Sequence, residues 1–168
     1  DEVWAALVTA DEGVEGFVSD VGVANLSVIV PVPEVQIAIL VRNVDQGGSF
    51  AASAQGDPGE TLEYQITLTT PVTSADAQAV EVSSHVPRYT TVVTSGPVFA
   101  SYSIGGGGSG NVSTAQDTEN SNEVSGHVSG TDVKFFVGTG QEGASGSQTG
   151  GIVIPNSTVT LTYQVNID

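Results

Sequence analysis

The chain has 168 residues, and 19 acidic side chains against 3 basic ones give it a net charge of −16. So acidic a chain repels phosphate backbones, which excludes nucleic acid as a partner. It has no cysteine, which excludes disulfides, thiolate nucleophiles and cysteine-based metal sites. No apolar run approaches the roughly 18 residues of a membrane-spanning helix, so we expect no membrane span.

Residues 1–33 differ from the rest of the chain. Short apolar pieces surround an acidic stretch at residues 11–16, and residues 21–32 are strand-prone. Pro31 and Pro33 indicate a strand boundary or a sheet edge, because proline has no backbone donor for a ladder. The chain opens with Asp1 rather than Met, which we interpret as a mature form, secreted after signal-peptide removal.

The next segments are predicted to be strands. Residues 35–44 form a near-continuous apolar run, which favours a strand buried on both faces, and residues 49–54 form a short, weak strand. After a turn at residues 56–59, residues 61–70 alternate cleanly and direct Leu62, Tyr64, Ile66 and Leu68 to one face. Residues 77–84, 90–94 and 98–103 indicate three more strands.

The last third of the chain alternates between loops and strands. Residues 105–110 are Gly-rich and predict a flexible loop, and the polar stretch 111–122 predicts an exposed one. Residues 123–129 and 132–137 indicate a hairpin, followed by a Gly- and Ser-rich loop at 138–151. Residues 158–167 again alternate, with Val159, Leu161, Tyr163, Val165 and Ile167 on the inward face.

Several short strands separated by turns indicate a sandwich or barrel. We therefore predict an all-β fold, an immunoglobulin-like or jelly-roll-like β-sandwich with an N-terminal strand extension. The extension spans residues 1–33, and the sandwich domain spans residues 34–168.

Three stretches carry a resemblance to a known family: residues 58–68, which begin Pro-Gly-Glu-Thr; residues 79–87, which end Val-Pro; and residues 154–165. Together they resemble the opening strand, the second strand with its corner, and the closing strand of the "domain of unknown function eleven" repeat. The resemblance implies an immunoglobulin-like sandwich on the surface proteins of bacteria or archaea. It implies no enzymatic activity. The Gly-rich insert at residues 105–151 is long for that family.

The candidates for catalysis are weak. His85 and His127 are the only histidines, and no Gly-x-Ser-x-Gly elbow accompanies them. We expect a protein that is not an enzyme.

Carboxylates and amides gather in the polar stretch, at Asp117, Glu119, Asn122 and Glu123. Calcium prefers oxygen ligands of this kind, so these residues are the candidate metal ligands and calcium the candidate cofactor. A second acidic group comprises Asp11, Glu12 and Glu15. For both groups, the alternative is a solvated acidic loop.

Three Asn-x-Ser/Thr sequons, at Asn25, Asn111 and Asn156, are candidate glycosylation sites in a secreted glycoprotein, and we rank Asn111 first.

Two functions of different classes fit these features. The first is a structural subunit of an extracellular filament, pilus-like, thread-like or tubular. It would form a head-to-tail homopolymer in which residues 1–33 donate a β-strand to a neighbour. This link to bacterial and archaeal filaments is an architectural analogy. The alternative is a monomeric adhesin or surface-layer module that binds glycan or calcium through its loops. Besides further copies of the chain, other cell-surface components are candidate partners.

Overall fold

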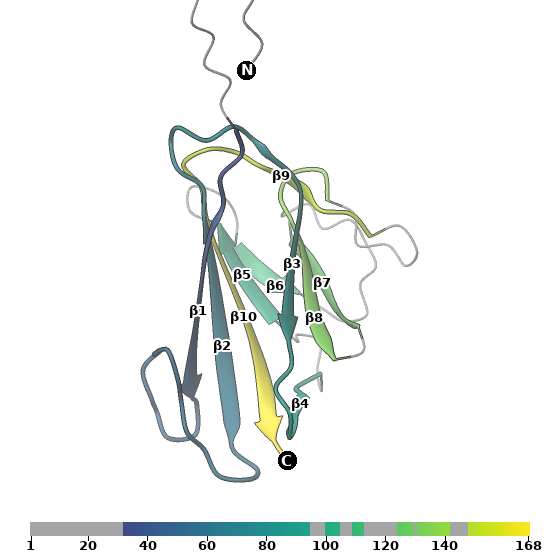
Figure 1. Cartoon of the computed structure of the whole chain (residues 1–168). Coiled ribbons are helices and arrows are strands. Elements are labelled where there is room, and N and C mark those ends of the chain that lie inside the picture. The colour runs from purple at the N-terminus through teal and green to yellow at the C-terminus, as the bar shows by residue number, and fades with distance from the viewer. Residues whose placement is uncertain (1–31, 95–99, 105–108, 113–123, 130, 142–147) are drawn as a thin grey trace, which may run out of the picture. The chain divides into compact units, whose positions relative to one another are not determined.

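The computed structural model describes residues 32–94, 100–104, 109–112, 124–129, 131–141 and 148–168. They belong to one compact unit, Val32–Asp168. Their regular secondary structure consists of ten β-strands, and these lie in two antiparallel sheets (Figure 1). The all-β prediction is confirmed for this part of the chain.

The larger sheet has the order β1-β2-β10-β5-β6, and β4 also pairs with β10. Its strands are β1 (Gln36–Asn43), β2 (Thr61–Thr69), β4 (Thr90–Val92), β5 (Ala100–Ile104), β6 (Ser109–Val112) and β10 (Thr158–Ile167). Strands β2 and β10 pair over nearly their whole length, as their clean alternation predicts. Strand β1 pairs with the other edge of β2, so it forms the border of the sheet (Figure 1).

The smaller sheet joins its strands in the order β7-β8-β3-β9. They are β3 (Ala77–His85), β7 (Val124–Ser129), β8 (Asp132–Val137) and β9 (Gly151–Val153). Strands β7 and β8 form the predicted hairpin. The pairing of β3 with β9 is irregular between Ala77 and Val80, where Ala79 has a left-handed φ of 54°.

One hydrophobic core joins the two sheets. The larger sheet contributes Ile66, Leu161 and Val165, and the smaller one contributes Val133 and Phe135. Tyr163 lies among them, and its hydroxyl and that of Ser84 are 2.8 Å apart, so the two sheets also share a buried hydrogen bond. Two facing sheets that share one core form a sandwich-like arrangement.

Three predictions about individual segments are wrong. Residues 35–44 form β1, but most of this strand is exposed rather than buried on both faces. Residues 49–54 form only an isolated bridge, between Ala51 and Val41. Two short strands, β6 and β9, extend into the predicted Gly-rich loops. Strand β6 pairs with the preceding strand β5 and β9 pairs with the distant β3, and this pairing outweighs the weak local preference of Gly and Ser.

Candidate binding groove

The inward-facing side chains of β1 are left uncovered. Ile37 pairs with Leu68 of β2, and Ile39 pairs with Ile66, so both isoleucines share the face of β2 that forms the core. Yet Ile37 is 64% exposed and Ile39 is 52% exposed, whereas Val41, two residues further along the same face, is buried. The core therefore ends in an open, apolar border at the start of β1.

The backbone of this border is also free to pair. Val41 exchanges two hydrogen bonds with Ala51, on the side of β1 opposite to β2. Backbone groups alternate in direction along a strand, so the N–H and C=O of Ile37 and Ile39 point to that same outer side. Among the described residues, no strand occupies the outer side of β1 at these two positions. Apolar side chains and free ladder groups thus coincide on the same two residues.

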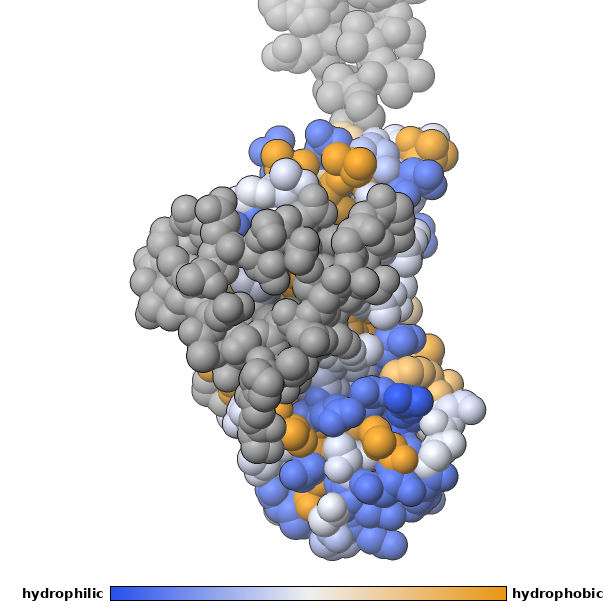
Figure 2. Space-filling view, turned by 180° about the vertical axis from the view of Figure 1, so that it is seen from behind, coloured by the Kyte–Doolittle hydropathy of each residue, from blue (hydrophilic) through white to orange (hydrophobic). Residues whose placement is uncertain are grey.

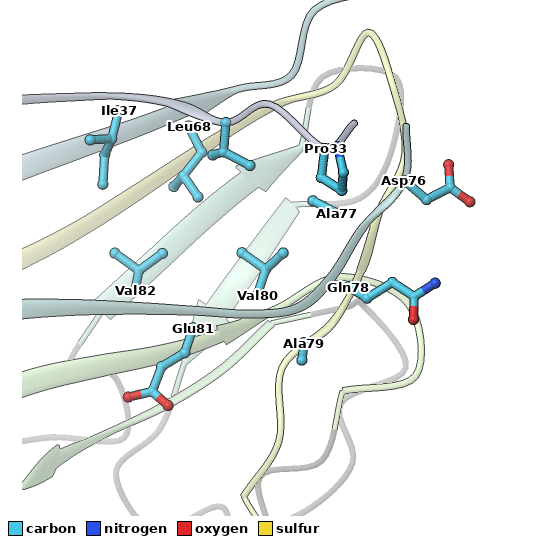
Figure 3. A pocket seen from close by; sticks show the side chains of 11 residues that line it. Pro33, Ile37, Leu68, Asp76, Ala77, Gln78, Ala79, Val80, Glu81 and Val82 are labelled. Atoms are coloured by element: carbon cyan, nitrogen blue, oxygen red, sulfur yellow. The ribbon is translucent and has the colours of Figure 1, made fainter. Parts of the chain in front are cut away.

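The start of β3 forms the opposite wall. A groove of about 690 Å³ lies between Pro33, Val35, Ile37 and Leu68 on one side and residues 76–82 on the other. In Figure 3, Val80 and Val82 point toward Leu68 and Ile37, whereas Ala79 and Glu81 point away from them. The floor of the groove is therefore aliphatic.

The open part of the outer edge has a limit at each end. At one end, Pro33 has no backbone N–H for a ladder, and the chain is anchored there because the C=O of Val32 accepts a bond from the N–H of Ala75 and the N–H of Glu34 donates to the Ser74 hydroxyl. At the other end, the Ala51 bridge occupies the outer edge of Val41. Residues 35–40 lie between these limits and form the open window of the strand edge.

The charged groups lie on the rim. Asp76 and Glu81 line the groove on the side of β3. The Nζ of Lys134 lies 2.7 Å from the Glu81 carboxylate, and this hydrogen bond, with the attraction between the charges, raises the pKa of Lys134 above its ordinary value. An apolar floor with a charged rim suits an apolar segment of polypeptide better than a charged small molecule.

Hydrophobic residues also gather at the end of the unit where the described chain begins, on the face seen in Figure 2. Val32, Val72 and Ile154 are all strongly exposed there. Backbone bonds from Ala75 to Val32 and from Asn156 to Pro71 hold these segments together. This apolar end adjoins the groove, since Pro33 lines it.

The predicted metal ligands Asp117, Glu119, Asn122 and Glu123 lie outside the described residues, as do Asp11, Glu12 and Glu15. Within the described part of the chain, no group of three or more His, Asp or Glu side chains is arranged to hold a metal ion. The calcium hypothesis therefore stays a prediction.

The three sequons have different positions. Asn25 lies outside the described residues, and the backbone of Asn111 belongs to β6. Asn156 is exposed in the turn before β10 and has a left-handed φ of 58°. Asn156 thus meets the requirement of accessibility that glycosylation imposes.

The two histidines lie on the smaller sheet, on separate strands. His85 pairs with Asp132 at 2.9 Å, an exposed contact between residues that are opposite each other in β3 and β8. The neighbouring Ser84 directs its hydroxyl into the core toward Tyr163. His127 stacks on Phe136 and contacts the Gln148 side chain. The His85–Asp132 pair is accounted for as a cross-strand contact on the surface.

Sequence reasoning missed the groove because it placed the apolar run of β1 inside the fold. One signal pointed the other way: Pro31 and Pro33 stand directly before this run, and proline is tolerated at edge strands rather than central ones.

Comparison of the chain with protein-family models, with curated proteins and with solved structures finds no match. The resemblance to the surface-protein repeat therefore stays a prediction. Among the described residues, no helix is long and apolar enough to cross a membrane.

Proposed function

We propose that this protein is a non-enzymatic structural subunit of an extracellular filament, and that its subunits assemble by donation of a β-strand. The observation that carries the proposal is the open border of β1. There, Ile37 and Ile39 present uncovered side chains and outward backbone groups at the same two positions. An immunoglobulin-like or jelly-roll-like sandwich that lacks one strand has a border of this kind.

An open apolar edge of this kind is a liability unless a strand covers it. Natural sheets protect their edges with charges, prolines or bulges, because unpaired edges recruit other chains. The window from residue 35 to residue 40 has none of these devices: its members are Val35, Gln36, Ile37, Ala38, Ile39 and Leu40. Burying a fully exposed isoleucine side chain contributes roughly 1.5–3 kcal/mol, and a strand that covers Ile37 or Ile39 gains the share that corresponds to its exposed fraction of 64% or 52%.

The same chain contains a segment suited to cover the edge. Residues 21–32 are strand-prone by sequence, and all of them but Val32 directly precede the described unit, which begins at that residue. If each copy gives this segment to the next one, every subunit keeps one filled groove and one donated strand. Such a heterologous contact does not close on itself, so it produces a thread or tube.

Deleting residues 1–30 tests the proposal. The truncated chain retains all of Val32–Asp168 and should form no filaments by electron microscopy, while the full chain does. Deleting residues 1–10 alone is the matched control, because it retains residues 21–32 and should leave filaments intact. Thermal unfolding of the truncated chain verifies that the sandwich still folds. Filaments that form without residues 1–30 would overturn the proposal. A full-length chain that stays monomeric at high concentration would favour the adhesin or surface-layer alternative.

A further inference from the structure

In the part of the chain that the structure describes, two strand edges beside the groove are unpaired, and they are not equivalent. One is the outer edge of β1. The other belongs to β3, which over Glu81–His85 pairs with β8 alone, so its second edge has no strand partner among the described residues. We propose that the donated strand is residues 26–30 of a second copy, and that it adds to β1 rather than to β3, parallel to β1. This inference rests on the proposed function.

On β1, the free backbone groups and the groove belong together. Ile37 and Ile39 direct their ladder groups outward and their side chains toward the groove. Residues directly opposite each other in neighbouring strands place their side chains on the same face. A strand that pairs with Ile37 and Ile39 therefore places alternate side chains over Val80 and Val82.

On β3, the free backbone groups belong to residues whose side chains point away from the groove. The N–H of Val86 donates to the C=O of Thr131, next to β8, and by alternation the groups of Ser84 and Val82 also face β8. The outward groups are then those of Glu81 and Ser83, whose side chains are exposed, and Glu81 is charged and bound to Lys134.

Backbone irregularity protects β3 further. Ala79 has a left-handed φ of 54°, and the register of β3 shifts between Ala77 and Val80. A bulge and a charged side chain are both devices that keep a natural edge from pairing. Strand β1 has neither in its window, so β1 is the receptive edge.

The window on β1 fits residues 26–30 in length and pattern. It extends from residue 35 to residue 40, between Pro33, which has no backbone N–H, and the Ala51 bridge at Val41. In the sequence, Leu26, Val28 and Val30 alternate with Ser27 and Ile29, and Pro31 then ends the run of backbone donors. Three alternating aliphatic side chains would thus face the groove.

The direction of the strand decides between a filament and a closed dimer. The acceptor's own chain enters at Val32, beside the first residues of β1. A parallel strand reaches its last residue near Val41, so the donor's folded unit lies beyond the opposite end, and addition continues head to tail. An antiparallel strand brings two entry ends together, where two copies can exchange strands around a two-fold axis and stop.

Disulfide trapping tests the edge and the direction in the full chain, which has no cysteine of its own. Leu26→Cys, Val28→Cys or Val30→Cys is combined with Ile37→Cys or Ile39→Cys. The matched control combines Ser27→Cys or Ile29→Cys with Ser83→Cys on the other edge, because Ser83 lies on the exposed face of β3 and these two alternate donor residues would share that face. Oxidised samples are resolved on a non-reducing gel, and electron microscopy verifies that each variant still forms filaments.

We expect the β1 combinations to give a ladder of cross-linked oligomers on the gel, and we expect reduction to convert this ladder to monomer. The Ser83 control should give at least tenfold less cross-linked oligomer. In a parallel strand, the donor position that links best to Ile39 is two residues later than the one that links best to Ile37. A position two residues earlier would overturn the parallel direction.

A ladder from the Ser83 combinations instead, or intact filaments without any β1 ladder, would overturn the choice of edge while strand donation stands. A cross-linked monomer would mean that the strand folds back onto its own chain. The proposed function itself fails by a separate result, filaments that persist without residues 1–30.

Discussion

Strands β1 and β10 flank β2 on its two edges and present the same kind of side chain to the same face. Ile39 and Leu161 both lie opposite Ile66, one from each neighbour. Leu161 is completely buried, and Ile39 is 52% exposed. Within the described part of the chain, strand β10 has partners on both edges, whereas the start of β1 has only β2. Apolar character and register therefore do not determine burial by themselves, and the missing neighbour of β1 accounts for the difference.

The largest expected effect is a difference in the free energy of unfolding that is lost when a side chain of β10 or of β1 is truncated. Leu161→Ala should lower the free energy of unfolding by about 2–5 kcal/mol, because it opens a cavity in a fully packed core. Ile39→Ala should cost the isolated subunit less than about 1 kcal/mol, because that side chain is already half in water. Urea unfolding of dilute, unassembled protein measures both. Equal losses would mean that the start of β1 is covered within its own subunit.

A smaller effect distinguishes two tyrosines that stack on each other across β2 and β10. Their ring centroids are 5.3 Å apart, but Tyr163 is buried and hydrogen-bonded to Ser84, whereas Tyr64 is half-buried. Tyr163→Phe should lower the free energy of unfolding by about 1–3 kcal/mol, because the Ser84 hydroxyl loses its partner. Tyr64→Phe is the matched control and should change it by less than about 0.5 kcal/mol.

The double variant of Tyr163→Phe with Ser84→Ala sharpens this result. Its loss should be smaller than the sum of the two single losses, because removing both partners leaves no unsatisfied buried group. Additive losses would show that the bond between the two sheets contributes little.

Much of the fold could be predicted from the sequence where local pattern and tertiary environment agree. Strands β2 and β10 alternate because one face meets the core, so Leu62, Ile66, Leu161 and Val165 were assigned inward and are buried. The β7–β8 hairpin was predictable for a similar reason, because its strands are close in sequence and separated by a short turn.

The groove could not be predicted in the same way. A continuous apolar run such as that of β1 is the expected pattern for a central strand with two neighbours. The same pattern also fits an edge strand that is covered only when another chain binds, so the sequence does not distinguish the two. Contacts over long sequence separations were also missed. The pair of His85 and Asp132 joins residues 47 positions apart. Strand β9 pairs with β3, from which more than 60 residues separate it, and also bridges to Thr139.

The smallest expected effect concerns the far end of β1, which is anchored while its start is free. Glu60 accepts hydrogen bonds from the backbone N–H of Asp57 and from the side chains of Asn43 and Gln46. These bonds, that of Asp57 first, lower the pKa of Glu60 below its ordinary value of 4.5. A lowered pKa means that the folded state favours the carboxylate. The carboxylate therefore stabilises the fold above pH 4.5, and this contribution is lost as the pH falls through the lowered pKa.

The Glu60→Gln variant should accordingly lose less stability than the unaltered chain as the pH falls into the acid range. Urea midpoints measured from neutral pH down to acid should fall less steeply for the variant below pH 4.5, and the two curves should approach each other there. Gln46→Ala removes one of the three bonds and should produce a fraction of the same effect. The start of β1 should show no such dependence on Glu60, because its own anchors are Ser74 and Ala75. If the stability of the Glu60→Gln variant falls with pH as steeply as that of the unaltered chain, the hydrogen bonds of Glu60 do not stabilise the end of β1.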